Sequence, residues 1–259
     1  MYLIDSHCHL NLVQKKNSFE NITHILNNAH QKNIKLILTV STSIQDYKQS
    51  IQLFKRYPNI LYSCGIHPLN SEIMIINNID LLEKKILNNK KIIALGETGI
   101  DFHYSKKHKK QQIYFFEKHL EFGQKYKKPI IIHTRNAESD TINILSKKYF
   151  QSCTGIIHSF TGSIDMIRKL LNLNFYISFS GIITFKNAQY MNKIIQYVPM
   201  NRMLIETDSP YLSPTPYRGK CNQPSYIFYI AKYIAELKKI SILDLSKRIK
   251  KNFYTLFDL

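Results

Sequence analysis

The amino-acid sequence predicts an α/β fold, specifically a (β/α)8 TIM barrel. Short apolar runs recur along the chain, segments with helical spacing separate them, and no Pro-, Ser- or Gly-rich linker interrupts the 259 residues. Eight strands alternating with helices over about 250 residues are typical of that barrel. We therefore expect one barrel domain that spans residues 1–259.

Eight apolar runs are expected to form the strands of the barrel. Each run is short, continuous and rich in Ile and Leu, as strands buried on both faces of a parallel sheet are. The runs cover residues 2–5, 35–41, 60–68, 91–101, 129–135, 153–160, 175–181 and 202–210.

The segments between these runs have the spacing of amphipathic helices. In residues 111–126, four apolar side chains recur roughly on one helical face, opposite charged ones. They are Ile113, Phe116, Leu120 and Phe122. The same spacing recurs in residues 141–150, 166–174 and 191–198, and in the tail at 226–237 and 242–257. An open doubly wound sheet would alternate in the same way, but no Gly-rich phosphate loop follows any strand, which favours the barrel.

The composition, 44% hydrophobic and 21% charged, allows a sizeable buried core. No apolar run is long enough to span a membrane, and no secretory signal is visible, so we expect a cytoplasmic protein with no membrane partner. The four cysteines form no CxxC pair and are expected to be reduced thiols. We also expect a monomer with no obligate protein partner.

The formal charge of +18 favours a polyanionic partner such as DNA. A second explanation stays open, because only six of the 36 basic residues are arginine and the chain is rich in Lys, Asn, Ile and Tyr. An AT-rich genome imposes that bias on any protein. The charge alone therefore does not establish a nucleic-acid partner.

Histidine and carboxylate side chains collect where six of the eight strands end, and active sites of such barrels are built there. In chain order they are His7 and His9, His67, Glu97, His133, His158 and Asp208. Five of the ten histidines stand at these positions, which scattered core histidines would not do. In an extended backbone His7 and His9 point to one side and Cys8 to the other, so the thiol is not expected to join them.

Each of these residues also has a purely structural interpretation. His133 and His158 could be core histidines bonded to backbone carbonyls, and His67 could shape a turn. Glu97 and Asp208 could cap the helices that follow them. A shared metal site explains all of them together, whereas the structural interpretation needs a separate coincidence on strand after strand.

The number of these ligands points to two ions. A catalytic zinc uses three protein ligands and a water, so four histidines and two carboxylates exceed what one tetrahedral ion requires. Two cations that share a carboxylate use the set better, and they lower the pKa of a bound water to roughly 7. The mixed nitrogen and oxygen ligands suit Zn, Mn, Co or Mg and do not choose among them.

Six motifs run in order from Asp5 to about Ile227, namely DSHCHL, GIHP, GETGIDFHY, PIIIHTR, IIHSFTGS and ETDSPYLSPTPYRGKCNQPSYI. Together they resemble the successive motifs of the TatD-type metal-dependent deoxyribonucleases. The resemblance implies a barrel of the amidohydrolase type with two divalent cations. The ligands that it implies are His7, His9 and Asp208 for one ion, His133 and His158 for the other, and Glu97 as the bridge.

The leading hypothesis is therefore a metal-dependent deoxyribonuclease, often a 3′→5′ exonuclease in this family, in which a metal-activated water attacks the phosphodiester bond. Glu97 and Asp208 are its expected catalytic residues, with Asp208 also accepting a proton. The residues expected to hold phosphates or bases are His67, His103, Tyr104, Arg135 and Arg218.

Two alternatives stay open. A two-metal hydrolase could instead cleave a carbon ester or amide, such as an aminoacyl-tRNA ester or a small molecule. Many barrel hydrolases of that kind bridge their ions with a carboxylated lysine, whereas this chain offers Glu97, which leans toward the nuclease branch. A non-catalytic nucleic-acid-binding protein would use the +18 charge but would leave the histidines and carboxylates unexplained.

Overall fold

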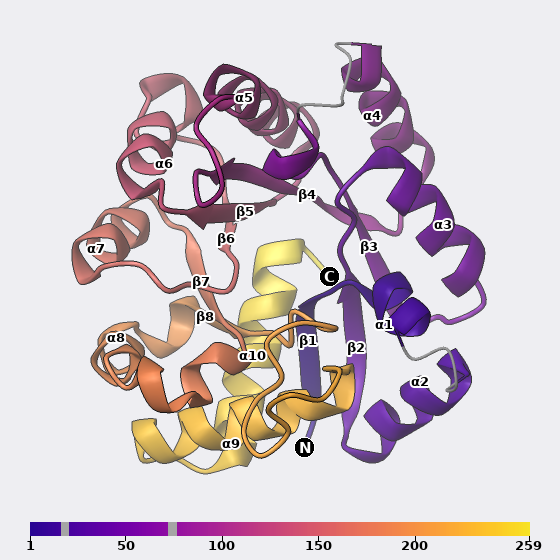
Figure 1. Ribbon diagram of the computed structural model, residues 1–259, viewed down its shortest axis with the longest axis vertical. Helices are drawn as coiled ribbons and strands as arrows, with labels where there is room; N and C mark the ends of the chain where they lie inside the picture. Colours follow the sequence, from indigo (N-terminus) through magenta and orange to yellow (C-terminus); the bar gives the residue numbers. More distant parts are fainter. Residues whose placement is uncertain (17–20, 72–76) are drawn as a thin grey trace.

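The computed structural model contains an eight-stranded parallel barrel, as the sequence predicts (Figure 1). It describes residues 1–16, 21–71 and 77–259. Each strand pairs in parallel with the next one along the chain, from β1 to β8. Their bounds are β1 Leu3–Cys8, β2 Ile34–Thr39, β3 Ile60–Cys64, β4 Ile92–Asp101, β5 Ile130–Arg135, β6 Gly155–Ile157, β7 Tyr176–Phe179 and β8 Met203–Ile205.

Helices follow the strands and form the outer layer of the barrel (Figure 1). Serine side chains cap several helix starts; Ser163, for example, accepts the Met166 N–H at 3.1 Å. Among the described residues, no helix has the length and apolar character needed to cross a bilayer. The bounds are α1 Leu10–Lys16, α2 Ile22–Gln31, α3 Ile44–Phe54, α4 Asn77–Asn88, α5 Lys109–Tyr126, α6 Glu138–Leu145, α7 Ile164–Asn172, α8 Met191–Tyr197, α9 Ile227–Lys238 and α10 Ile242–Phe257.

The first and last strands meet and nearly close the barrel. The Ser6 hydroxyl donates to the Ile205 carbonyl at 2.9 Å, and the Asp208 N–H donates to the His7 carbonyl at 2.9 Å. Residues about 200 positions apart in the chain are therefore neighbours. This closure places the DSHCHL and ETDSP motifs side by side at one end of the barrel.

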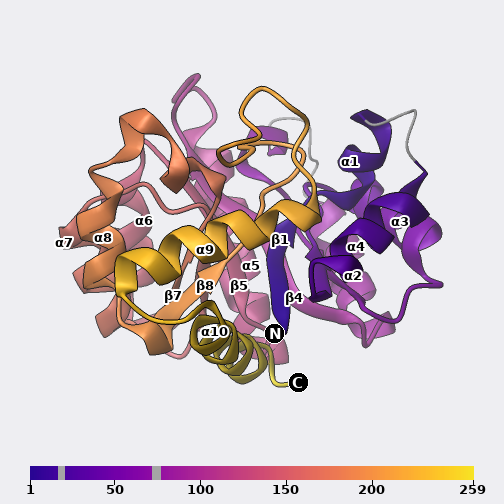
Figure 2. The same cartoon turned by 90° about the horizontal axis from the view of Figure 1, so that it is seen from below.

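The opposite end of the barrel is covered by α10, which lies beside the N-terminus (Figure 2). Its apolar face is fully packed, with Leu245, Ile249 and Phe253 buried. Burial of each such side chain contributes roughly 1.5–3 kcal/mol. Because α10 seals the N-terminal ends of the strands, the C-terminal ends are left to form a site.

Some strands end at other residues than the sequence predicts. The strand β1 extends to Cys8, so His7 is part of the strand and not of a loop after it. The strands β3, β6 and β8 are shorter than predicted and end at Cys64, Ile157 and Ile205. Their polar motif residues His67, His158 and Asp208 lie in the segments that follow these strands.

Candidate metal centre

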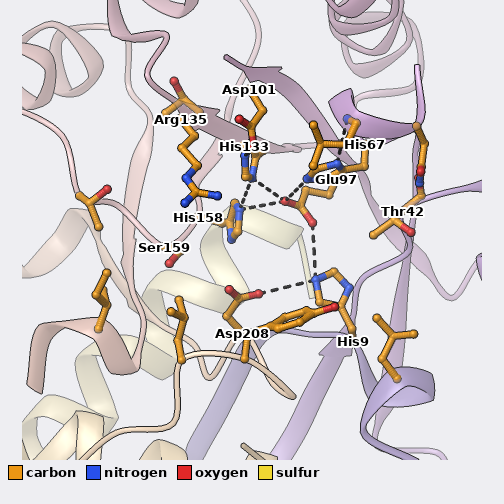
Figure 3. A pocket seen from close by; sticks show the side chains of 18 of the residues that line it. His9, Thr42, His67, Glu97, Asp101, His133, Arg135, His158, Ser159 and Asp208 are labelled. Carbon is orange, nitrogen blue, oxygen red and sulfur yellow. Dashed lines mark hydrogen bonds and ion pairs between the residues drawn. The ribbon is translucent and has the colours of Figure 1, made fainter. Parts of the chain in front are cut away.

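Side chains from six strand ends meet in one buried cluster at the C-terminal end of the barrel (Figure 3). Glu97, which lies within β4 four residues before the strand ends, is at the centre of the cluster and is 2% exposed. Its Oε2 atom faces His7 and His9. Its Oε1 atom faces His133 and His158. The structure therefore brings together the residues that the sequence predicts as metal ligands.

Four atoms on one side of Glu97 lie close together, at distances longer than most hydrogen bonds. They are Nε2 of His7, Nε2 of His9, Oδ1 of Asp208 and Oε2 of Glu97. Five of the six distances among them lie between 3.4 and 3.7 Å, which is at or beyond the limit of a hydrogen bond. Ligand atoms around a tetrahedral zinc, with bonds of about 2.0–2.2 Å, stand roughly 3.4 Å apart. This donor set therefore fits a divalent cation.

The other side of Glu97 carries a second candidate group. The Oε1 atom lies 2.9 Å from His133 Nδ1 and 2.9 Å from His158 Nε2, and these two nitrogens are 3.0 Å apart. In each imidazole the ring nitrogen that faces away from Glu97, which we call the outer nitrogen, lies close to a further carboxylate. His133 Nε2 is 2.9 Å from Asp101 Oδ2, and His158 Nδ1 is 3.1 Å from Glu206 Oε1.

These outer contacts also fit a metal site. A neutral imidazole has one proton and cannot donate to two carboxylates at once. If Asp101 and Glu206 accept the outer N–H groups, His133 and His158 present unprotonated nitrogens toward Glu97. Carboxylates that accept the outer N–H of metal-binding histidines are a common feature of metal sites and fix the tautomer.

Sequence reasoning missed both Asp101 and Glu206, although each had a signal. Asp101 lies four residues after Glu97 in the same strand and therefore on the same side of it. Glu206 lies two residues before Asp208 in the ETDSP motif. Both are acids within motifs already chosen for their chemistry, but the spacing alone does not tell which histidine each one contacts.

Two local features of the sequence position these side chains. Gly99 has a φ of +135°, and a Cβ there would lie 2.0 Å from the His133 carbonyl oxygen. Only glycine permits this approach of β4 to β5. Asp5 is fully buried in β1 and accepts hydrogen bonds from the Thr207 N–H at 2.9 Å and the Thr207 hydroxyl at 2.6 Å. It fixes the start of the loop that carries Asp208.

The charges of the cluster favour ionised carboxylates beside imidazole nitrogens. Burial raises the pKa of Glu97, but the surrounding imidazoles, that of His158 foremost, outweigh it and hold the pKa well below its usual range. Burial also raises the pKa of Asp208, and the neighbouring imidazoles, that of His9 first, outweigh it and keep the pKa low. Burial lowers the pKa of His7, which keeps this imidazole neutral and its lone pair available.

The cluster lines a pocket of about 610 Å³. His67, Tyr104 and Arg135, three of the residues predicted to hold substrate, line the same pocket. Tyr104 is 73% exposed, and the Arg135 guanidinium lies 5.9 Å from the centre of its ring. Tyr211, which sequence reasoning missed, also lines the pocket, and the Lys16 ammonium lies 4.5 Å from its ring centre.

The other two residues predicted to hold substrate, His103 and Arg218, are not among those that line the pocket. His103 is exposed, and its ring packs edge-to-face with the Tyr104 ring, with 4.7 Å between the two ring centres. Arg218 is exposed and its guanidinium lies 3.5 Å above the Phe185 ring. Cys8 is fully buried and belongs to none of the candidate metal groups in the described part of the chain.

A parallel barrel with a buried cluster of histidines and carboxylates at the C-terminal ends of its strands defines a metal-dependent hydrolase of the barrel class. The chain belongs to the TatD family, because the model of the family described as TatD related DNase matches residues 4–258. It is thus a metal-dependent hydrolase of that family.

Known proteins align with this chain over nearly its whole length. An "uncharacterized metal-dependent hydrolase", BU355 of Buchnera aphidicola subsp. Acyrthosiphon pisum, is 51% identical over 264 residues and covers 100% of both chains. YcfH of Escherichia coli K12, described in the same words, is 39% identical over 99% of this chain and 96% of its own. The crystal structure of YjjV, a TatD homolog from Escherichia coli K12, has the same fold, with a TM-score of 0.91 and 22% identity over 99% of this chain and 98% of that one.

Proposed function

We propose that this hydrolase cleaves phosphodiester bonds of DNA with two divalent cations bound at the cluster. The placement of Glu97 carries the proposal. Its Oε2 lies 3.5 Å from His7 Nε2, and its Oε1 lies 2.9 Å from His133 Nδ1. A carboxylate placed between two groups of ligands can bridge two ions, and such pairs clamp both the attacking and the leaving oxygen of an in-line displacement.

The roles of the protein side chains follow from their contacts. When bound, the cations would lower the pKa of an attacking water and offset the charge on the phosphoryl oxygens. Asp208 lines the pocket beside His9, and its carboxylate can accept the proton of that water. Asp101 and Glu206 hold protons on the outer nitrogens of His133 and His158 and orient both rings.

The mouth of the pocket supports a nucleic-acid substrate. Tyr104 and Tyr211 are 73% and 45% exposed, and each has a cationic group near its ring, Arg135 and Lys16 respectively. An aromatic ring next to a cation suits a nucleobase and the phosphate beside it. The +18 charge and the description of the family as TatD related DNase agree with DNA.

A second candidate is hydrolysis of a carbon ester or amide, such as an aminoacyl-tRNA ester or a small molecule. The pocket volume of about 610 Å³ favours it, because small-molecule sites have volumes of that order. It keeps the same ions and changes only the bond that is cleaved. A non-catalytic nucleic-acid binder ranks last, because it gives the buried cluster no role.

An activity screen of the purified protein tests the proposal. The protein is stripped of metal, reloaded separately with Zn²⁺, Mn²⁺, Co²⁺ or Mg²⁺, and incubated with single-stranded DNA, double-stranded DNA, RNA, aminoacyl-tRNA and small esters. We expect metal-dependent cleavage of DNA that a chelator and Asp208→Asn abolish, and end-labelled DNA will show whether cleavage starts from the 3′ end. Turnover of an amide or carbon ester with none of DNA would replace the proposal with the second candidate.

A further inference from the structure

The imidazole of His67 is fixed in one tautomer by its own backbone. His67 precedes the short 3-10 helix Pro68–Asn70, and its Nδ1 accepts the Leu69 N–H at 3.1 Å. An accepting nitrogen carries no proton, so the single proton of the neutral ring sits on Nε2. The atom that points into the pocket is therefore an N–H donor.

This tautomer separates His67 from the other histidines of the cluster. Its Nε2 lies 3.3 Å from Glu97 Oε1, and its position beside Glu97 and His133 would also suit a metal ligand. A nitrogen binds a cation through a free lone pair, which a protonated Nε2 lacks. At His133 and His158 the arrangement is the reverse, because their outer nitrogens face carboxylates that accept a proton.

Hydrogen bonds to Thr42 and to His119 hold the segment that carries His67 in place. The His67 N–H donates to the Thr42 carbonyl at 2.9 Å, and the Asn70 side chain donates to the same carbonyl at 2.9 Å. The preceding Ile66 N–H donates to the buried Nε2 of His119 at 3.1 Å. A donor anchored in this way needs little reorganisation to meet a developing charge.

The N–H of His67 is also available to a ligand. Its contact with Glu97 Oε1, at 3.3 Å, is longer than those of His133 and His158 with the same oxygen, at 2.9 Å. A distance of 3.3 Å is beyond the usual range of N–H···O hydrogen bonds, so Glu97 holds this N–H only weakly. His67 lines the pocket, and its side chain is 13% exposed.

From this geometry we infer that His67 is a catalytic hydrogen-bond donor to an oxygen of the substrate and not a metal ligand. The inference rests on the proposed hydrolysis of a phosphate ester. In that reaction the Nε2–H of His67 donates to a phosphoryl oxygen as negative charge develops on it. Removal of one such donor lowers turnover by about 10²–10³-fold.

Two measurements test the inference without any turnover. Long-range ¹H–¹⁵N spectra of the Zn²⁺-loaded protein report the tautomer of each histidine, with His67→Gln to assign the signal and exposed His30→Gln as a control. We expect His67 to be protonated at Nε2. Calorimetric titration with Zn²⁺ should give the same number of ions, with affinities within about threefold, for the parent and His67→Ala. A proton on Nδ1, or the loss of an ion in His67→Ala, would overturn the inference.

Kinetics then test the role as a donor. We expect His67→Ala to lower kcat on a thymidine dinucleotide by at least ~100-fold, and His67→Gln to recover part of the loss through its amide N–H. The second substrate is thymidine 5′-(4-nitrophenyl phosphate), whose nitrophenolate leaving group needs little stabilisation. An equal loss of kcat in His67→Ala on both substrates assigns the contact of His67 to a non-bridging oxygen. A loss confined to the dinucleotide assigns it to the leaving oxygen. Unchanged kcat in His67→Ala on both substrates contradicts the inference, whereas an inactive parent contradicts the proposed function instead.

Discussion

Asp101 Oδ2 lies 2.9 Å from Nε2 of His133, on the side of the ring away from Glu97. Asp101 is itself held from behind by Gln112 of α5, whose Oε1 accepts the Asp101 N–H at 2.9 Å and whose amide donates to the Asp101 carbonyl at 3.1 Å. Gln112 is 4% exposed. Its side chain satisfies the backbone N–H and C=O of Asp101, as a neighbouring strand would do. A helix on the outside of the barrel therefore fixes the direction of a candidate metal ligand.

Loss of this support is expected to weaken metal binding. In Gln112→Ala the backbone of Asp101 loses both of these hydrogen bonds, which loosens Asp101 and the orientation of His133 that depends on it. We expect the affinity of the ion at His133 to fall by about 10–100-fold, the range found for such supporting contacts. Competition with a chelating dye measures this affinity. The neighbouring Gln111→Ala is the matched control, because Gln111 is exposed. Equal affinities in the two variants would contradict the role of Gln112.

The candidate ligands could be predicted from the sequence because each lies in the C-terminal half of a buried strand or just after it. The barrel brings the C-terminal ends of all its strands to one face. Residues at equivalent positions of successive strands can therefore be expected to lie close together. The alternation in DSHCHL likewise gave the correct pairing, since the Nε2 atoms of His7 and His9 lie 3.4 Å apart. These inferences needed only strand geometry and residue chemistry.

The contacts between strands could not be predicted in the same way. The pairing of Asp101 with His133 depends on how closely β4 approaches β5, and that of Glu206 with His158 joins segments about 50 residues apart. The position of His103 depends on a turn, because its N–H donates to Asp101 Oδ1 at 2.8 Å and its side chain is exposed. Such details arise from tertiary packing and not from spacing.

The thiol of Cys8 is expected to be dispensable. Cys8 is fully buried, and burial raises the pKa of its thiol well above the usual range, so that the thiolate form that binds metals is disfavoured. We expect Cys8→Ser to retain metal content and most of the activity, which elemental analysis and the DNA assay measure. Loss of one equivalent of bound metal from a folded Cys8→Ser protein would count against the geometry of the whole cluster.

A buried histidine outside the cluster should make stability depend on pH. His119 Nδ1 lies 2.6 Å from the Phe115 carbonyl, its Nε2 accepts the Ile66 N–H, and burial lowers its pKa from 6.5 to about 4. The unfolded chain binds a proton at this residue near pH 6.5 and the folded chain only near pH 4. The free energy of unfolding is therefore undiminished above pH 6.5 and falls with pH below it, by about 2 kcal/mol between pH 7 and pH 5.

Urea unfolding at pH 7 and pH 5 tests this dependence against His119→Gln. The variant has no titrating group at this position and keeps a side chain that can hydrogen-bond to the Ile66 N–H. We expect it to be less stable than the parent at pH 7 by about 1–2 kcal/mol and to lose less stability on going to pH 5. The difference between the two proteins isolates His119 from all other groups. Parallel pH profiles would show that His119 does not titrate in this range.

DNA binding should depend only weakly on salt. Several surface lysines are already paired with acids, such as Lys109 with Asp140 at 2.7 Å and Lys125 with Glu83 at 2.8 Å. Arg135 is the only Lys or Arg among the described residues that line the pocket. With one to three phosphate contacts, log K for single-stranded DNA should change with log salt by a slope of about −0.7 to −2. Binding to a catalytically inactive Asp208→Asn protein measures it, and a slope near −4 would mean that the basic surface binds the strand.

The last prediction concerns Glu97, on which the two-ion proposal depends. Its two oxygens face different groups of histidines, and its charge would offset the repulsion between two dications. Glu97→Gln keeps the size of the side chain but removes the charge and one good ligand oxygen. We expect the second ion to bind much more weakly and turnover of DNA to fall by at least ~100-fold.

Calorimetric titration with Mn²⁺ or Zn²⁺ shows the change in stoichiometry directly, and circular dichroism checks that the barrel is intact. Surface Glu121→Gln is the matched control, since Glu121 pairs only with Lys118 among the ion pairs of the described residues. Glu97→Ala should behave like Glu97→Gln without unfolding the protein, because Glu97 faces a polar cluster at the end of β4 and not the apolar core. If Glu97→Gln still binds two ions and cleaves DNA within a few-fold of the parent, Glu97 does not bridge the ions and the two-metal proposal is wrong.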